Sequence, residues 1–323
     1  HLFQLNYLYG KKWQDENNKA MIIALITIVT LLYFVLPFIY KTYHLSQLNN
    51  HSQLIDTSAG IIEYRLKGDK GPVVLFVHGS PGGHDQTMIH SENFRVLTLS
   101  RPGYLRTPLS AGKTPLEQAK ALKALLDALS IEQVIIIGAS GGGPASMEFA
   151  AAYPDSTLGL IAFEAVSFSA DFSGEDNGLI KLSDRALLFS LLLIKVFGDA
   201  VAATKMLPNK INQEKALSSP KNIKTLKDLM WSVWPLSLRR DGFSNDYEQF
   251  KQLSLPLSSI KIPTIVIHGD EDINVDLDQA VFTKDNILNA KLHIIKGADH
   301  YMSATHSEEI EIIIKDFIKE VTL

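Results

Sequence analysis

The sequence predicts an α/β fold: a doubly wound, mostly parallel sheet with a helical cap insertion and an N-terminal transmembrane helix. Three observations lead to this prediction. Residues 21–40 are apolar and contain no charge. Beyond them, continuous apolar runs of strand length alternate with segments of helical periodicity, the pattern of a parallel sheet covered by helices. One long stretch, about 169–260, separates two such strands and is expected to be mostly helical.

Eight apolar runs are predicted as strands, several of them bounded by turn-forming residues. They are 54–57, 61–66, 73–77, 94–99, 134–137, 158–164, 264–268 and 291–296. A helix is expected after Thr114. Thr114 as N-cap and Glu117 three residues later form a capping box, and Pro115 stands at the first helical position. We therefore expect one large α/β domain over 54–323.

The segment 21–40 is expected to cross a membrane once. Twenty residues in an α-helix span about 30 Å, the thickness of a bilayer's hydrocarbon core. No small-residue cleavage site follows Tyr40, which favours an anchor over the alternative of a cleaved signal peptide. The chain then divides into a tail 1–20, the anchor, a polar linker 41–53 and the domain that follows.

The basic residues beside this segment predict its orientation. Three lysines precede it and one follows closely: Lys11, Lys12 and Lys19, then Lys41. Because basic residues favour the cytoplasmic side, the bulk of the chain is expected on the non-cytoplasmic side. Met21 is an alternative start of the chain, and with that start the argument from the preceding lysines disappears.

The composition restricts the chemistry that the chain can use. With no cysteine among 323 residues, disulfides, thiolate metal sites and a cysteine nucleophile are excluded. The net charge is −4, and no basic stripe with interleaved aromatic residues is present, so no nucleic-acid partner is expected.

The strand 134–137 leads into Gly138-Ala139-Ser140-Gly141-Gly142, a Gly-x-Ser-x-Gly pattern followed by helix-forming residues. A serine on a sharp strand-to-helix turn needs a backbone with positive φ, and the flanking glycines leave room for that turn. The turn exposes the hydroxyl, and the helix N-terminus behind it can stabilise negative charge. Ser140 is therefore the predicted nucleophile; the alternative is a plain glycine-rich turn.

The loop after strand 73–77 carries the first resemblance to a known family. Its sequence His-Gly-Ser-Pro-Gly-Gly, 78–83, resembles the oxyanion loop of the α/β-hydrolase superfamily, and the resemblance extends over residues 54–323. It implies an oxyanion hole made by the backbone N–H groups of Ser80 and Gly141, with a structural role for His78. The segment 100–107 resembles the family's Asp-x-Arg-Gly-x-Gly-x-Ser loop, with Ser100 at the place of the usual aspartate.

The same resemblance implies an acid for a catalytic triad. The family places it in a Gly-x-x-Asp pattern after the strand 264–268, which selects Asp272. Asp270 is a near alternative, and Glu164, after the preceding strand of the sheet, is a distant one. The acid must fix the histidine tautomer and stabilise the imidazolium ion that forms during catalysis.

The base is implied by a Gly-x-x-His pattern after the last strand, 291–296, which selects His300. The order Ser140, Asp272, His300 is the order of the triad in α/β hydrolases. Each of the three patterns follows a predicted strand, and the three occur in the family's order, which argues against a chance match.

The insertion 169–260 is expected to form a helical cap over the site. Its segment 186–197 is too short to span a bilayer and is predicted either as cap core or as an apolar surface facing acyl chains or membrane. Three aromatic residues are candidates for the pocket lining or the core: Trp231, Trp234 and Phe243. The stretch 239–246 resembles an Arg…Gly…Asn-Asp pattern of some capped family members, without an assigned role.

These features together predict a membrane-anchored serine hydrolase that cleaves small-molecule carboxylic esters through an acyl-enzyme, without a metal or an organic cofactor. The alternative from the same fold is a proline-iminopeptidase-like aminopeptidase, which would need cap carboxylates to hold the substrate's amino terminus. Six are available: Asp171, Glu175, Asp176, Asp241, Asp246 and Glu248. A non-catalytic, anchored binding module is the alternative from another class, and the intact triad argues against it.

Overall fold

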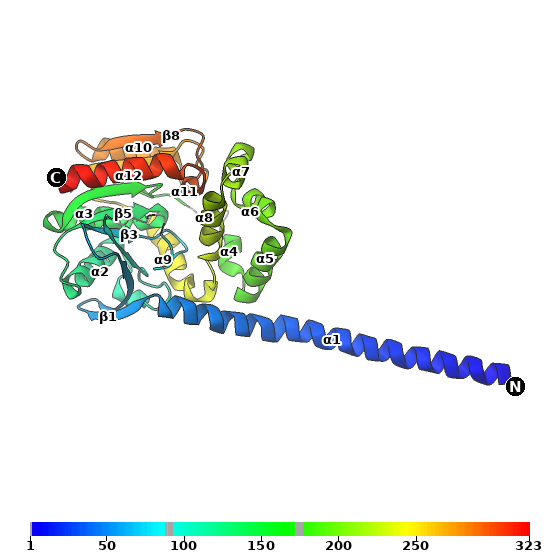
Figure 1. The fold of residues 1–323 in the computed structure, drawn as a ribbon. Coiled ribbons are helices and arrows are strands. Elements are labelled where there is room, and N and C mark those ends of the chain that lie inside the picture. The colour runs from blue at the N-terminus through cyan, green and yellow to red at the C-terminus, as the bar shows by residue number, and fades with distance from the viewer. Residues whose placement is uncertain (1, 88, 90–92, 172–176) are drawn as a thin grey trace. The chain divides into compact units, whose positions relative to one another are not determined.

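The computed structural model describes residues 2–87, 89, 93–171 and 177–323. Within them the chain forms two compact units, His1–Asn50 and His51–Leu323. The larger unit is built around an eight-stranded sheet in the order β1-β2-β4-β3-β5-β6-β7-β8 (Figure 1). β1 pairs with β2 and β2 with β4 in antiparallel fashion, whereas all other neighbours are parallel. The predicted mostly parallel sheet is therefore confirmed.

The strands lie within one or two residues of their predicted positions. Their bounds are β1 Gln53–Thr57, β2 Gly60–Lys67, β3 Val73–Val77, β4 Arg95–Leu99, β5 Val134–Ala139, β6 Thr157–Phe163, β7 Thr264–Gly269 and β8 Lys291–Ile295. β3 and β5 are buried at every position because helices cover both faces of the sheet.

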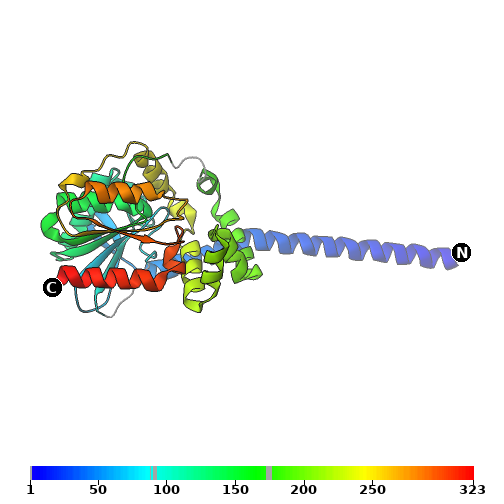
Figure 2. The same ribbon diagram turned by 90° about the horizontal axis from the view of Figure 1, so that it is seen from above.

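Apart from α1, which forms the first unit, the α-helices of the described residues belong to the two faces of the sheet and to the cap. Their bounds are α1 Leu2–Asn50, α2 Pro115–Ala128, α3 Gly143–Ala152, α4 Asn177–Lys181, α5 Asp184–Phe197, α6 Asp199–Met206, α7 Lys210–Leu217, α8 Pro220–Trp231, α9 Arg240–Phe250, α10 Leu277–Asn286, α11 Met302–Thr305 and α12 Ser307–Thr322. α10 and α12 lie on opposite sides of the sheet (Figure 2). The doubly wound arrangement follows from this.

Two hydrophobic clusters form the core, one on each face. Because successive strand residues point to opposite faces, Val73 and Leu75 of β3 join the cluster with α2, α3 and α10, whereas Val74 and Phe76 join the cluster with α12. The start of α2 is the predicted capping box: Thr114 Oγ1 accepts from the Glu117 N–H, and the Glu117 carboxylate accepts from the Thr114 N–H.

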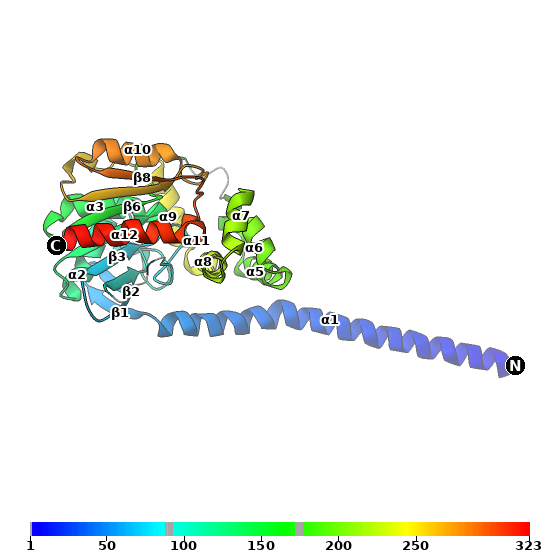
Figure 3. The same ribbon diagram turned by 45° about the horizontal axis from the view of Figure 1, so that its top comes forward.

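The segment between β6 and β7 contains the helices α4 to α9, so the described part of the predicted cap is mostly helical. α5, α6 and α7 lie together beside α8 (Figure 3). On α5, three leucines are buried, whereas Leu193, Val196 and Phe197 are exposed. The buried face agrees with the cap-core interpretation of the segment 186–197, whereas contact of its exposed face with acyl chains or a membrane stays a prediction. Trp234 is fully buried in the cap, and its indole N–H donates to the carbonyl of Asp184 at 2.9 Å.

The first unit is the single helix α1, which has Pro37 inside it. Its portion Lys11–Asn50 is the one helix among the described residues that is long and apolar enough to cross a membrane, with a mean hydropathy of 2.7 in its most apolar window. A signal sequence near an N-terminus has the same properties. The helix continues through residues 41–50, where the polar composition suggested a linker.

Candidate active site

The turn after β5 has the geometry that the Gly-x-Ser-x-Gly pattern predicts. Ser140 has φ = 48°, in the left-handed region that is costly for a residue with a Cβ. A Cβ at Gly138 would lie 2.6 Å from the hydroxyl oxygen of Ser146, and one at Gly142 would overlap the carbonyl of Val77. Both glycines are therefore required by close packing, and the turn delivers Ser140 to the start of α3.

His300 lies between Ser140 and Asp272, within hydrogen-bonding distance of both, although the three residues come from separate segments of the chain. His300 Nε2 is 3.1 Å from Ser140 Oγ, and His300 Nδ1 is 2.7 Å from Asp272 Oδ2. Because the carboxylate can only accept, Nδ1 carries the proton and Nε2 is free to accept from the serine hydroxyl. This is the arrangement that a general base next to a nucleophile requires.

Asp272 is held as an ionised carboxylate. Its second oxygen, Oδ1, accepts the backbone N–H groups of Asn274 at 2.8 Å and Val275 at 2.9 Å. Burial would raise the pKa of Asp272, but the facing imidazole of His300 and these hydrogen bonds keep that pKa below its usual range. The charge is thus available to orient His300.

The two alternative acids do not bond to His300. Asp270 is committed elsewhere, because its Oδ1 accepts from the Gly297 N–H at 2.6 Å and its Oδ2 pairs with Lys296 at 3.1 Å. Glu164 lies closer to His300: one of its carboxylate oxygens is within 4.8 Å of a carboxylate oxygen of Asp272 and of a ring nitrogen of His300. It follows directly after β6 and has φ = 48°. Of the three carboxylates, only Asp272 makes a hydrogen bond to His300.

Glu164 is a buried acid in a negative environment. Burial raises its pKa well above the usual range, and the nearby carboxylates of Asp272 and Asp299 raise it further. One of its oxygens, Oε1, has no hydrogen-bond partner. A cation could be bound by three neighbouring side chains, those of Glu164, Asp272 and His300. The only free lone pair of His300, however, faces Ser140. A bound cation would therefore break the contact between His300 and Ser140.

The expected oxyanion donors lie side by side next to Ser140. A Cβ at Gly141 would overlap the hydroxyl of Ser80, and a Cβ at Gly79 would lie 3.0 Å from the Cβ of Ser140. Ser80 and Gly141 therefore flank Ser140, and the N-terminus of α3 lies directly behind it. The N–H groups of these two residues remain the predicted donors.

His78 is a neutral, fully buried histidine that supports the loop 78–83. Its Nδ1 donates to the Gly79 carbonyl at 2.7 Å, and its Nε2 accepts from the Arg101 backbone N–H at 2.9 Å. Burial lowers the pKa of His78 well below its usual range, and the guanidinium of Arg101 lowers it further.

This buried histidine predicts acid destabilisation. The unfolded chain binds a proton at His78 near pH 6.5, whereas the folded chain does not, so folding stability should fall as the pH drops below about 6.5. Each such histidine lowers the free energy of unfolding by up to ~1.4 kcal/mol for every pH unit below that value. We expect the Tm of the detergent-solubilised protein to be lower at pH 5.5 than at pH 7.5. His78→Gln should lower the Tm at both pH values and reduce the difference between them; an unchanged difference would contradict this assignment.

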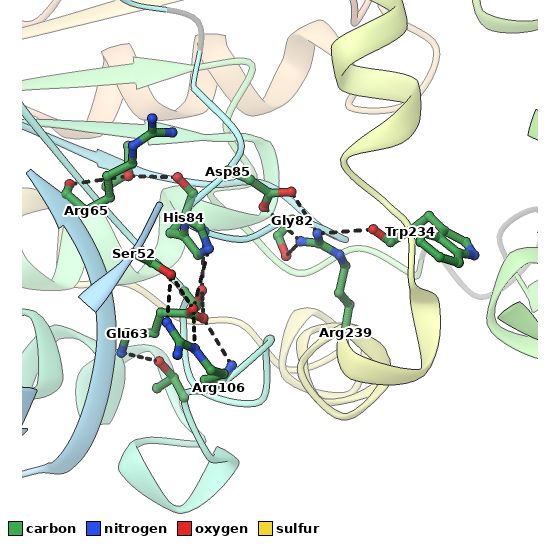
Figure 4. A network of polar contacts seen from close by, with 12 residues as sticks. Ser52, Glu63, Arg65, Gly82, His84, Asp85, Arg106, Trp234 and Arg239 are labelled. Atoms are coloured by element: carbon green, nitrogen blue, oxygen red, sulfur yellow. Dashed lines mark hydrogen bonds and ion pairs between the residues drawn. The ribbon is translucent and has the colours of Figure 1, made fainter. Parts of the chain in front are cut away.

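Glu63 brings a carboxylate to Ser100, the position at which the resemblance places an aspartate. Its Oε2 accepts from Ser100 Oγ at 2.9 Å, and its Oε1 accepts from Arg106 Nε at 2.7 Å and from Ser52 Oγ at 2.8 Å (Figure 4). Glu63 is buried on β2, which pairs with β4 at the start of this loop. Sequence reasoning missed Glu63, and the unusual Ser100 was the only signal that a carboxylate had to come from another element.

A cavity of about 200 Å³ opens at Ser140 and His300. Much of its lining is apolar or aromatic and comes from the sheet and the cap: Phe76, Leu229, Val233, Phe243, Tyr247 and Phe250. Of the three aromatic candidates in the cap, Phe243 lines this cavity, whereas Trp231 and Trp234 do not belong to its described lining. Among the described lining residues, Glu164 is the one carboxylate, and none is Lys or Arg.

Comparison with known proteins gives the same picture of the fold. Residues 72–307 match the family model described as alpha/beta hydrolase fold. The chain is 27% identical to an uncharacterised hydrolase of Bacillus subtilis over 77% of this chain and 91% of that protein. It is 26% identical to a 2-hydroxy-6-oxononadienedioate/2-hydroxy-6-oxononatrienedioate hydrolase of Paraburkholderia xenovorans over 80% of this chain and 90% of that protein. An alpha/beta hydrolase fold protein of Nakamurella multipartita superposes with a TM-score of 0.75 at 29% identity, covering 82% of this chain and 97% of that one.

Proposed function

Because the chain belongs to the alpha/beta hydrolase fold family, we propose that it is a serine hydrolase that cleaves carboxylic esters with Ser140, His300 and Asp272. The observation that carries this proposal is the position of His300, which lies 3.1 Å from the serine hydroxyl and 2.7 Å from the carboxylate. A serine with a base in hydrogen-bond reach, and a base oriented by an acid, form the arrangement used for acyl transfer.

The proposed reaction has two acyl transfers. Ser140 Oγ attacks the ester carbonyl carbon while its proton moves to His300 Nε2, and the negative oxygen binds the N–H groups of Ser80 and Gly141. His300 then gives the proton to the departing alcohol oxygen, which leaves an acyl-enzyme. Water then attacks the carbonyl of the acyl-enzyme while its proton moves to His300. His300 returns this proton to Ser140 Oγ as the bond between Oγ and the acyl carbon breaks, and the carboxylic acid is released. The chain's own residues supply the nucleophile, base and oxyanion donors, so no metal or organic cofactor enters these steps.

The cavity lining favours a neutral, apolar acyl group. The Paraburkholderia xenovorans relative acts, by its name, on dicarboxylates. A dicarboxylate needs cationic or hydrogen-bonding partners when it leaves water. The described lining of this cavity offers neutral hydrogen-bonding groups such as Gln86, Thr87 and Asn274, but no Lys or Arg to balance the charge of a carboxylate, and much of the rest is aromatic or aliphatic. We therefore propose small esters with an uncharged acyl part as substrates.

The aminopeptidase alternative finds less support in the cap. Asp246 is engaged by Arg101 in a buried ion pair, and Asp241 and Glu248 are exposed. None of the described cap carboxylates lines the cavity. Glu175 and Asp176 lie outside the described residues. An aminoacyl substrate's ammonium group would therefore lack an ionised partner among the described cap residues, so we place esters before aminoacyl amides.

We also propose that α1 anchors the enzyme in a membrane as a single span, with the catalytic domain on the non-cytoplasmic side. The support is the length and composition of Lys11–Asn50 and the excess of lysines before the most apolar segment.

Labelling of membranes that contain the full chain with a fluorophosphonate probe tests both proposals. Phosphonylation is expected on the tryptic peptide that contains Ser140, because only a serine activated by a base reacts readily. The labelled protein is expected to stay in the membrane pellet after a carbonate wash. Labelling elsewhere, or none on a folded sample, would overturn the hydrolase; release into the supernatant would overturn the anchor alone. p-Nitrophenyl esters of increasing acyl length, compared with aminoacyl amides, then define the substrate.

A further inference from the structure

We propose that Asp246, on the cap helix α9, is a positioning residue that holds Ser80 in place as an oxyanion donor. This inference rests on the proposed hydrolase function. Asp246 lies 166 residues after Ser80 in the chain, yet its side chain bonds to the Ser80 hydroxyl. The contact gives a role to the stretch 239–246, and it makes the cap a part of the catalytic geometry.

Asp246 is buried and accepts four hydrogen bonds. Its Oδ2 accepts from the hydroxyl of Ser80, from Tyr104 Oη at 2.6 Å and from Arg101 Nη2 at 2.5 Å. Its Oδ1 accepts from Arg101 Nη1 at 3.0 Å. The pairing with Arg101 is bidentate, which fixes the plane of the carboxylate as well as its charge. The carboxylate therefore has one defined position, and the Ser80 hydroxyl is bonded to it.

Arg101 connects the same carboxylate to the backbone of the loop 78–83. Its Nε donates to the His78 carbonyl at 3.0 Å, and its Nη2 donates to Ser80 Oγ at 3.0 Å. Both charges of the ion pair are almost fully buried. Removing one partner of such a pair leaves an uncompensated buried charge. Without the Asp246 charge, Arg101 would have to move or be hydrated, and the loop carbonyl that it binds would move with it.

Ser80 has little freedom to shift without a cost to catalysis. Its hydroxyl fills the space next to Gly141, so the two predicted oxyanion donors are in contact. An oxyanion donor acts only when its N–H points at the position of the developing charge, and loss of one donor typically costs 10²–10³ in kcat. Since the Ser80 side chain is bonded to both Asp246 and Arg101, its backbone N–H is held from the side of the cap.

A second contact holds the other end of this loop. Arg239, at the residue before α9, donates through Nη1 to the Gly82 carbonyl at 2.6 Å, and its Nη2 pairs with Asp85 at 2.8 Å (Figure 4). The backbone also joins the cap to the neighbouring loop, because the Gly242 N–H donates to the Gly103 carbonyl at 2.9 Å. The segment around α9 thus binds the oxyanion loop on both sides of Pro81.

The variant Asp246→Asn tests the proposal in the full chain. An amide keeps the size of the carboxylate but loses the charge and one acceptor. We expect kcat for a p-nitrophenyl ester, per site titrated with fluorophosphonate, to fall about 10²-fold with KM within threefold. The affinity for a trifluoromethyl ketone, whose tetrahedral adduct places an oxyanion in the hole, should fall by a similar factor. Asp241→Asn, the same change at an exposed position of α9, should leave all three values unchanged.

A structural role alone gives a different result. Asp246→Asn would then reduce the number of titratable sites, while kcat per site and the ketone affinity would stay at the wild-type values, and this outcome overturns the proposal. Ser80→Ala is the second variant, because it removes the bond to Asp246 and leaves the buried ion pair; we expect about a tenfold loss of kcat and of ketone affinity. Unchanged values for Ser80→Ala overturn the proposal even if Asp246→Asn does not fold. A wild-type chain that fails to react with the probe would instead overturn the hydrolase function.

Discussion

Replacing Ser140 by alanine is expected to lower kcat for ester hydrolysis by about 10⁶-fold, the effect of removing a nucleophile that acts together with its base. The hydroxyl is the atom that His300 Nε2 contacts at 3.1 Å, and alanine leaves the imidazole without a proton to accept. KM should change little, because the cavity lining remains. Alanine also has to adopt φ = 48° at this turn, but it carries the same Cβ as serine and adds no backbone strain.

Ser146→Ala is the matched control for this variant. Ser146 is the next serine of the chain, and its hydroxyl donates to the carbonyl of Gly142, the residue before α3, rather than to a histidine. Its kcat should stay within about threefold of wild type, since loss of a single intrahelical side-chain hydrogen bond is a small effect. A Ser140→Ala protein with the wild-type circular dichroism spectrum and more than a hundredth of the wild-type kcat would refute the role of Ser140.

The parts of the fold and site that the sequence predicted are those that local chemistry determines. The β-branched run before Gly138 and the positive φ of Ser140 depend on neighbours within a few residues, so both could be predicted. The choice between Asp270 and Asp272 is different. Both are on one short loop, and only the structure shows that Asp270 binds the Gly297 N–H while Asp272 faces His300.

Contacts between distant segments could not be predicted. Glu63 bonds to Ser100, and Asp246 bonds to Ser80, across 37 and 166 residues of chain. Apart from the unusual Ser100, the sequence contains no signal for these two pairs, because any buried carboxylate could satisfy the same donors. The length of α1 was missed for another reason: the polar residues of 41–50 suit an exposed helix as well as a linker, and composition does not separate the two.

Asp272→Asn is expected to lower kcat by about 10⁴-fold, because an amide cannot hold the Nδ1–H tautomer of His300 or stabilise its imidazolium form. Glu164→Gln should change kcat by less than threefold. Burial raises the pKa of Glu164 well above its usual range, which favours the neutral acid, and glutamine has nearly the same shape as that acid and the same lack of charge. Steady-state kinetics on p-nitrophenyl esters measure both variants; the reverse ranking would make Glu164 the acid.

The double variant separates the roles of the two carboxylates further. After burial, the charge of Asp272 is the largest cause of the raised pKa of Glu164, so Asp272→Asn lowers that pKa. Glu164 then ionises more easily within 4.8 Å of the ligand atoms of His300 and partly replaces the missing charge. We therefore expect the kcat of Asp272→Asn to rise in part as the pH rises. The double variant Asp272→Asn, Glu164→Gln should show no such rise, and its kcat should be about tenfold lower than that of Asp272→Asn alone. Equal pH profiles for the single and double variants would show that Glu164 stays neutral and does not assist His300.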